Sequence, residues 1–102
     1  MIERKYRLKR TKIVATIGPS SMTKKKIRKM ILAGLNVCRI NFSHSNHESA
    51  LKIISIVRDL NTELHSHVAI LGDLQGPKLR IGEVKKDAVI TKGSQVVLQF
   101  GD

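Results

Sequence analysis

The sequence predicts an α/β fold in which helices cover a parallel sheet, followed by a segment of β structure. Nearly continuous apolar runs alternate with longer stretches in which apolar residues recur at helical spacing, in the order β-α-β-α-β. Continuous apolar strands with a helix in each crossover are typical of parallel sheets. After Pro77 the pattern changes to short runs of alternating polar and apolar residues, which favour antiparallel β structure.

The first strand and helix follow a basic lead-in, residues 1–10. The run KIVATI, residues 12–17, is rich in β-branched residues and ends in a Gly-Pro turn, so it predicts a strand. A helical stripe comes next: Ile27, Met30, Ile31 and Leu35. Three residues can cap the start of this helix: Ser20, Ser21 or Thr23. Gly34 is expected to end it.

Two more strands and one more helix complete the α/β part. NVCRINF, residues 36–42, predicts the second strand, and HESALKIISIVRDLNTEL, residues 47–64, predicts the second helix. The helix carries one apolar stripe: Ala50, Ile53, Ile54, Val57, Leu60 and Leu64. VAILGDLQGP, residues 68–77, predicts a third strand that stops at the final Gly-Pro pair. Rossmann-like sheets and (β/α)8 barrels both begin in this way.

The chain is strongly basic. Nineteen Lys and Arg residues against eight Asp and Glu residues give a formal net charge of +11. Such an excess occurs on solvated faces, in proteins that bind phosphorylated ligands and in nucleic-acid-binding proteins. With one Tyr, two Phe and no Trp, the chain has few of the aromatic side chains on which single-stranded nucleic acid stacks. We therefore expect no nucleic-acid partner.

The single cysteine and the length of the apolar runs indicate in which cellular compartment the protein lies. Cys38 excludes an internal disulfide, fits a reducing environment and is expected to be a small buried hydrophobe. No apolar run approaches the roughly 18 to 20 residues that cross a bilayer. We therefore expect a cytoplasmic protein with no membrane partner.

Polar residues follow each predicted strand. Three clusters are present: Gly18, Pro19, Ser20 and Ser21; Asn41, Ser43 and His44; and Asp73, Gln75 and Lys78. Because ligands collect at the carboxyl ends of parallel strands, these clusters form one candidate site. Arg39 lies inside the second strand and shares a face with Asn41 and Ser43 by the two-residue period of a strand.

Arg39 is the residue in this set that most needs an explanation. Burying an unpaired guanidinium costs several kcal/mol. A planar guanidinium is suited to clamp a phosphate or a carboxylate of a ligand. An internal ion pair with Asp73, expected on the adjacent strand, is the alternative explanation for Arg39. The sequence leaves both interpretations open.

Three blocks together resemble the pyruvate kinase family: TKIVATIGPSS from Thr11, AGLNVCRINFSHSNHE from Ala33 and GDLQGPKLRIGEV from Gly72. The resemblance implies the beginning of a (β/α)8 TIM barrel followed by the start of an inserted all-β lid domain. Residues 11–80 would be the first three βα units, and residues 81–102 the start of the lid. The family is usually a homotetramer.

The resemblance also implies an activity in glycolysis. Pyruvate kinases transfer the phosphoryl group of phosphoenolpyruvate to ADP, giving ATP and pyruvate, and use Mg²⁺ or Mn²⁺. The acidic residues that hold this metal, and the catalytic residues, lie in later barrel strands of the family. No catalytic residue is therefore expected within this chain, and residues 1–102 alone should not turn over substrate.

Site residues are implied in the same way. Arg39 matches the arginine that contacts the substrate phosphate. Asn41, His44 and Arg80 match positions near the nucleotide phosphates. The monovalent-cation site of the family is matched by Asn41, Ser43, Asp73 and the backbone carbonyl of Leu74.

The third block, DLQGPK, departs from the commoner family pattern Asp-Thr-Lys-Gly-Pro-Glu. Lys78 stands where the family usually has a glutamate. Its ammonium can supply the positive charge that potassium otherwise provides, so the block resembles the potassium-independent branch. We therefore expect that K⁺ is not required.

Two other functions remain as alternatives. One is a small basic protein that binds phosphorylated ligands or nucleic acid through its amino-terminal lysines. Its binding would weaken steeply as salt rises. The other is an inactive regulatory remnant that associates with the parent enzyme.

A three-stranded parallel sheet with open edges and uncovered apolar faces also predicts that the isolated chain is partly molten or aggregates.

Overall fold

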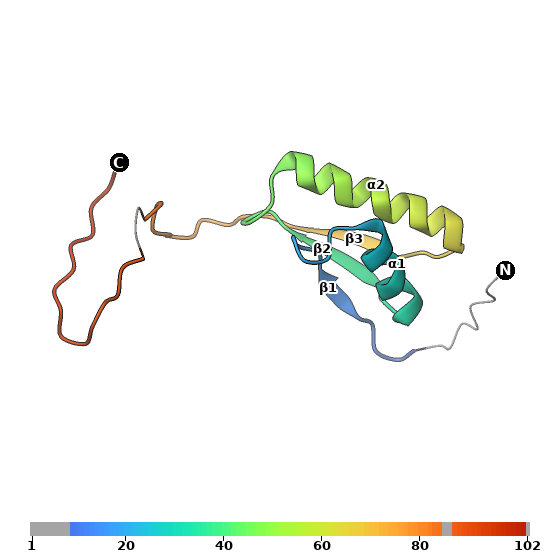
Figure 1. The fold of residues 1–102 in the computed structure, drawn as a ribbon, viewed down its shortest axis with the longest axis horizontal. Coiled ribbons are helices and arrows are strands. Elements are labelled where there is room, and N and C mark those ends of the chain that lie inside the picture. Colours follow the sequence, from blue (N-terminus) through green and yellow to red (C-terminus); the bar gives the residue numbers. More distant parts are fainter. Residues whose placement is uncertain (1–8, 85–86, 102) are drawn as a thin grey trace.

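The computed structural model describes residues 9–84 and 87–101. Three strands and two helices alternate along the chain: β1 (Val14–Thr16), α1 (Lys24–Ala33), β2 (Val37–Asn41), α2 (His47–Leu64) and β3 (Ala69–Asp73). Figure 1 shows this α/β unit, with the remaining carboxyl-terminal chain extending away from it. The predicted order β-α-β-α-β is confirmed.

The three strands form one parallel sheet in the order β1-β2-β3. In the central strand, Val37 is in register with Val14 on one side and Ala69 on the other. The strands therefore start level, and their carboxyl ends meet at one edge of the sheet. This edge carries the predicted polar clusters.

Local capping sets the bounds of α1. Of the three candidate caps, Thr23 is the one used, and its hydroxyl accepts a hydrogen bond from the backbone N–H of Lys26 at 3.3 Å. At the other end Gly34 has φ 117°, and its N–H donates to the carbonyl of Ile31 at 3.0 Å. Because this left-handed conformation suits glycine, the helix ends where the sequence predicts.

The second helix has the predicted bounds, His47–Leu64. Asn46 caps it, with its side-chain oxygen accepting from the N–H of Ser49 at 2.8 Å. The helix ends at His65, which has φ 49° and is the one described residue other than glycine with positive φ. Asn46 is a strong cap that the sequence analysis did not single out.

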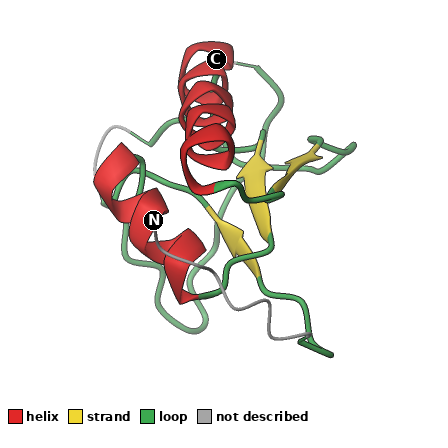
Figure 2. Ribbon diagram, turned by 90° about the vertical axis from the view of Figure 1, so that its right-hand side faces the viewer, coloured by secondary structure: helices red, strands yellow, loops and turns green. Residues whose placement is uncertain are grey.

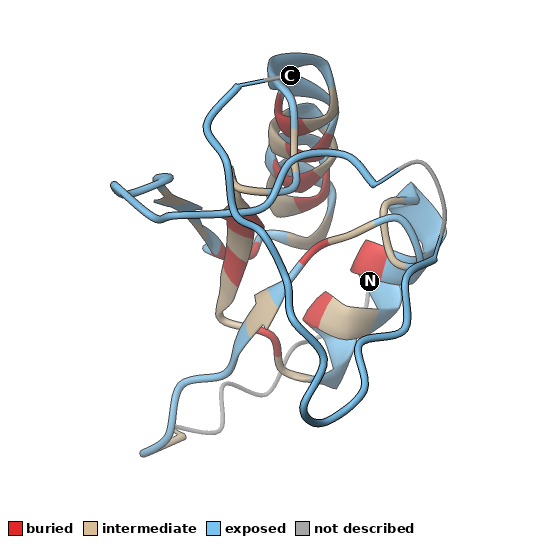
Figure 3. Ribbon diagram, turned by 90° about the vertical axis from the view of Figure 1, so that its left-hand side faces the viewer, coloured by how far each residue is buried: buried red, intermediate tan, exposed pale blue. Residues whose placement is uncertain are grey.

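Both helices lie on the same side of the sheet, as Figure 2 shows. The core between the helices and the sheet consists of aliphatic side chains and one thiol: Ile17, Ile27, Ile31, Leu35, Cys38, Ile40, Ala50, Ile53, Val57, Leu60 and Val68. Figure 3 shows the buried residues gathered between the helices and the sheet. Burial of each large aliphatic side chain stabilises the unit by about 1.5 to 3 kcal/mol.

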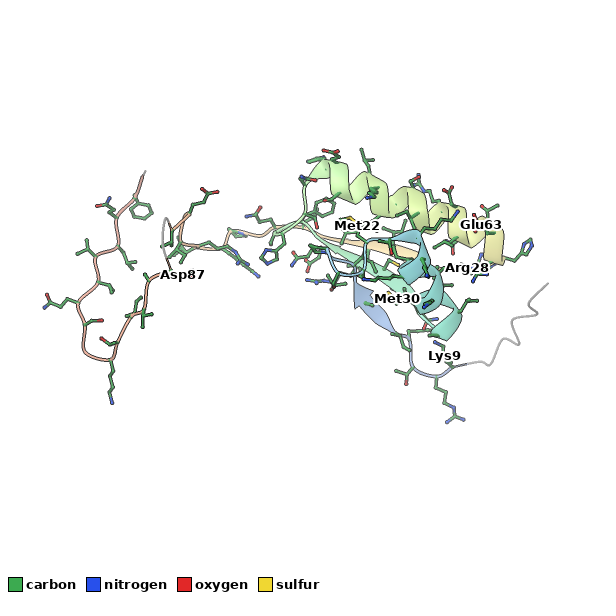
Figure 4. The ribbon with its side chains drawn as sticks, viewed as in Figure 1. Lys9, Met22, Arg28, Met30, Glu63 and Asp87 are labelled. Atoms are coloured by element: carbon green, nitrogen blue, oxygen red, sulfur yellow. The ribbon has the colours of Figure 1, made fainter. Side chains whose placement is uncertain are left out.

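An ion pair links the two helices at the surface. Lys24 in the first turn of α1 pairs with Glu63 in the last turn of α2, a residue labelled in Figure 4. The hydrogen bond to this carboxylate raises the pKa of Lys24. Because both side chains are about half exposed, with relative accessibilities of 47% and 50%, the pair contributes little to stability.

The other side of the sheet carries no helix within the described residues. Cys38 and Ile40 point to the core, so by the two-residue period Arg39 and its neighbours point to this helix-free face. Val14 is 53% exposed there and Leu71 42%. The expected uncovered apolar surface is therefore present.

The predicted antiparallel strands beyond Pro77 are absent from the described residues, 78–84 and 87–101. This segment runs away from the sheet (Figure 1), and its apolar side chains are exposed, with Phe100 fully accessible. No strand forms here because alternation leads to a strand only when a neighbouring strand supplies hydrogen bonds. Here the hydrogen bonds are local, as between the Ser94 N–H and the Thr91 carbonyl at 3.2 Å.

The predicted lead-in, residues 1–10, lies outside the described residues except for Lys9 and Arg10. The Lys9 ammonium donates to the carbonyl of Gly34 and, at 3.0 Å, to the Asn36 side chain. Lys9 therefore lies beside the turn after α1 (Figure 4). No helix of the described residues is long and apolar enough to span a membrane.

Candidate functional site

Arg39 joins all three strands on the helix-free face. Its Nη1 donates to the hydroxyl of Thr16 on β1 at 2.8 Å, and its Nε donates to Asp73 Oδ2 on β3 at 3.1 Å. Nη2 completes an ion pair with the same oxygen of Asp73. The internal ion pair, one of the two interpretations that the sequence left open, is thus formed.

Strand register explains this arrangement. Thr16 is the direct partner of Arg39, so their side chains emerge side by side on one face. Asp73 is in register with Asn41, two residues beyond Arg39, and therefore lies diagonally across from the guanidinium. A long arginine side chain spans that diagonal, whereas a shorter cation would not.

The guanidinium remains accessible to a ligand. The side chain of Arg39 is 31% exposed and that of Asp73 is 46% exposed. An ion pair that is this accessible contributes modestly to stability, because water screens it. A partly exposed arginine at the carboxyl edge of a parallel sheet is suited to bind an oxyanion.

The turn after β2 is organised by Asn41. Its side-chain oxygen accepts from the N–H of Ser43 at 3.1 Å, and its carbonyl accepts from the N–H of His44 at 3.1 Å. The backbone N–H of Phe42 donates to the carbonyl of Asp73 at 3.0 Å, which holds the turn against the end of β3. Asn41, Ser43 and Asp73 are thus brought together, and His44 lies exposed at the tip.

The turn after β1 satisfies its own polar groups. The hydroxyl of Ser21 accepts from the N–H of Gly18 at 3.0 Å, and the N–H of Ser21 donates to the carbonyl of Gly18 at 2.9 Å. Gly18 does not require a left-handed conformation here. The cluster therefore acts as a turn at the edge of the site.

The oxygen donors predicted for a monovalent cation fit one only in part. Carboxylate, amide, hydroxyl and carbonyl oxygens are suitable ligands for a hard cation. However, Arg39 already occupies Asp73 Oδ2, and the amide oxygen of Asn41 already accepts from Ser43. Across residues 9–84 and 87–101 there is no cluster of three or more His, Cys, Asp or Glu side chains that could hold a metal ion.

Four predicted site residues lie beyond β3 on the exposed segment: Leu74, Gln75, Lys78 and Arg80. Leu74 is 79% exposed, and the side chains of Lys78 and Arg80 are also exposed. Within the part of the chain that the structure describes, neither Lys78 nor Arg80 makes a side-chain hydrogen bond or ion pair with Arg39, Asn41 or Asp73. The structure therefore assembles the site around β2 and does not bring this segment to it.

Cys38 lies on the opposite, helix-covered face and is fully buried. Burial raises the pKa of its thiol to about 11. The thiol stays protonated near neutral pH, and its expected role as a buried hydrophobe is confirmed.

Thr16 is the site residue that the sequence analysis missed. It precedes the Gly-Pro turn that drew attention to the end of β1, and its hydroxyl is ordinary in a β-branched run. The available signal was its position as the last residue of the strand, on the edge where the polar clusters meet.

Comparisons with known proteins identify the family to which the chain is similar. A family model described as the pyruvate kinase barrel domain matches residues 8–101. A pyruvate kinase from Thermococcus litoralis is 53% identical over 94 residues, which cover 91% of this chain and 20% of that protein. Pyruvate kinase II from Salmonella typhimurium is 48% identical over 96 residues, which cover 94% of this chain and 18% of that protein.

A third relative extends the same pattern. A pyruvate kinase from Buchnera aphidicola of Schizaphis graminum is 45% identical over 92 residues, which cover 90% of this chain and 19% of that protein. The chain thus spans about a fifth of the length of the curated relatives it matches. Because the family model covers most of the sequence, the chain belongs to the pyruvate kinase family.

Proposed function

We propose that this chain is part of a pyruvate kinase that transfers the phosphoryl group of phosphoenolpyruvate to ADP, giving ATP and pyruvate. The observation that carries the proposal is Arg39, held between Thr16 and Asp73 at the carboxyl edge of a parallel sheet. Family membership supports the same assignment. The substrate phosphate is the ligand that Arg39 would bind.

The chemistry fits the residues present. Phosphoryl transfer depends mostly on positioning and on neutralising the charge that develops on the transferred group. Arg39 supplies a fixed positive charge for the phosphoryl oxygens. Asn41, His44 and Arg80 would contact the nucleotide phosphates. A divalent Mg²⁺ or Mn²⁺ ion, held by residues outside this chain, would supply further positive charge, so residues 1–102 alone should be inactive.

The bare side of the sheet supports a barrel architecture. In a (β/α)8 barrel the helices cover the outer face and the inner face is packed by side chains from all strands. Residues 11–80 would contribute the first three βα units, with Val14 and Leu71 on the inner face. Residues 81–102 would begin the all-β lid, where the other lid strands supply the hydrogen-bonding partners that the segment lacks here.

Lys78 leads to a proposal about cation dependence. Its ammonium would replace the charge of K⁺ near the acidic site, so the enzyme should keep most of its activity when Na⁺ or tetramethylammonium is the sole monovalent cation. Lys78→Glu should introduce a requirement for K⁺, measured as the ratio of kcat/KM with and without it. A wild-type activity that collapses without K⁺, together with an unchanged requirement in the variant, would contradict the proposal.

The proposed setting is a homotetramer in the cytoplasm. The family resemblance supports the assembly, and the single buried thiol suits a reducing compartment. Sedimentation equilibrium of the natural gene product tests the assembly, because the molar mass measured for a tetramer is four times that of the subunit.

The intact mass and activity of the natural gene product test the function. We expect a mass several times 11.4 kDa and ATP formation that depends on both phosphoenolpyruvate and ADP. Arg39→Met should lower kcat/KM by at least about 100-fold, because a charge-assisted bidentate contact is lost. A mass near 11.4 kDa without activity would instead favour a small basic binding protein, whose affinity for polyanions falls steeply with salt.

A further inference from the structure

We propose that Thr16 is a positioning residue, whose hydroxyl fixes the plane of the Arg39 guanidinium so that its remaining donors face the substrate phosphoryl group. The inference rests on the proposed function, because it names the residue that prepares Arg39 for that ligand. Thr16 does not itself touch the substrate.

The argument begins with the donors of Arg39. A guanidinium has five N–H groups. Asp73 receives one from Nε and one from Nη2, and Thr16 receives one from Nη1. One N–H on each terminal nitrogen is left. Two donors are what a bidentate contact with a phosphoryl group requires, so the internal ion pair and anion binding are compatible.

The contribution of Thr16 follows from how Asp73 is used. Both bonds from the guanidinium to Asp73 converge on a single oxygen, Oδ2. One shared atom acts as a pivot, about which the guanidinium plane can swing. The bond from Nη1 to Thr16 at 2.8 Å is a second anchor, on the opposite neighbouring strand. Two anchors on either side of β2 fix the plane before the ligand arrives, which lowers the cost of ordering it.

The test replaces the hydroxyl and keeps the shape. Thr16→Val is nearly isosteric, and β1 already carries a valine, Val14, at the preceding position on the same face. In the natural gene product, Thr16→Val should raise KM for phosphoenolpyruvate roughly tenfold, as for loss of one hydrogen bond to a charged group. KM for ADP should stay within about twofold on the same scale. Thr16→Ser should restore the wild-type value.

A matched control uses another threonine. The hydroxyl of Thr62 donates to the carbonyl of Arg58 within α2, far from the helix-free face. Thr62→Val removes the same group and should leave both KM values unchanged. If Thr16→Val behaves like this control, or if Thr16→Ser fails to restore KM, the inference is overturned.

A double-mutant cycle separates positioning from a merely structural effect. Arg39→Lys removes the nitrogen that Thr16 contacts, so adding Thr16→Val should then cause no further rise in KM. Multiplicative effects of the two changes would mean that Thr16 acts elsewhere. Thermal midpoints measured for all four proteins identify any change that only lowers stability.

Failure of the proposed function would be recognised separately. A wild-type gene product that forms no ATP would contradict the activity and leave the geometry to be tested by binding alone. Titration with inorganic phosphate then decides the inference. Phosphate affinity that depends on Arg39 and falls with Thr16→Val supports it, and affinity that is indifferent to the Thr16 hydroxyl overturns it.

Discussion

Asn61 holds the connection between α2 and β3 through its side chain. Its amide donates to the carbonyl of Val68 at 3.0 Å, and its oxygen accepts from the N–H of Val68 at 3.0 Å and the hydroxyl of Ser66 at 2.8 Å. Ser66 is buried, with 3% of its surface accessible. This one side chain thus makes three hydrogen bonds within the connection that leads to β3 and Asp73.

Asn61→Ala should destabilise the protein more than the loss of a helix cap. The change leaves buried groups of Ser66 and Val68 without partners, which costs about 2 to 4 kcal/mol. Asn46→Ala, which removes the α2 cap, should cost about 1 kcal/mol. Urea denaturation of the natural gene product measures the free energy of unfolding of both variants. Equal decreases in the two variants would contradict the role assigned to Asn61. Asn61→Asp keeps the accepting oxygen and should be intermediate.

The buried thiol of Cys38 makes the stability of the protein depend on pH in the alkaline range. Its pKa is about 11 when folded and near 9.0 when unfolded, so the folded state holds the proton more tightly. The stability contributed by the protonated thiol is complete below pH 9 and is lost as pH rises through 11. The loss amounts to roughly 2 to 3 kcal/mol. Between pH 8 and about pH 11 the free energy of unfolding, measured by urea denaturation, should therefore fall more steeply for wild type than for Cys38→Ala.

At the residue scale the sequence predicts the candidates better than their contacts. Arg39, Asn41, Ser43 and Asp73 were all expected at the site, and the structure brings them together. The contact with Thr16 was not expected. It depends on which residue of β1 stands opposite Arg39, and that register is fixed by packing between segments rather than by either segment alone.

At the level of elements, the end of α1 favours glycine at position 34. Gly34 has φ 117°, and a Cβ there would lie 2.8 Å from Lys9 Nζ. Gly34→Ala should therefore destabilise the protein by about 1 to 2 kcal/mol, mainly through backbone strain. Gly82→Ala, where φ is not positive and nothing lies within 4 Å, should change stability little. Thermal unfolding of both variants checks this, and equal midpoints would contradict the strain.

Helices were more predictable than strands, for a physical reason. Thr23 bonds to Lys26 and Gly34 bonds to Ile31, contacts that each span three residues, so local sequence determines the ends of α1. The β1 run was expected to span residues 12–17, but the residues that pair with β2 are Val14–Thr16. Alternation beyond Pro77 forms no strand among the described residues, because strand formation requires a partner.

For the whole molecule, the helix-free face predicts how residues 1–102 behave in isolation. Val14 and Leu71 are exposed on that face, and β1 and β3 are both edge strands. The isolated chain should bind a hydrophobic dye and associate, whereas the natural gene product should bind little dye. Dye fluorescence and light scattering test this. A sharp cooperative transition from a monomer would contradict it.

The sheet order β1-β2-β3 follows the order of synthesis. β2 and β3 each pair with a strand that precedes them in the chain, and the contacts that build the site span only 23 residues from Arg39 to Thr16 and 34 to Asp73. The Arg39 anchor on Thr16 can therefore form while later residues are still being translated, and Asp73 joins it as β3 leaves the exit tunnel. The corner of the protein that holds Arg39 would then be assembled during synthesis, with each new strand pairing with the strand before it.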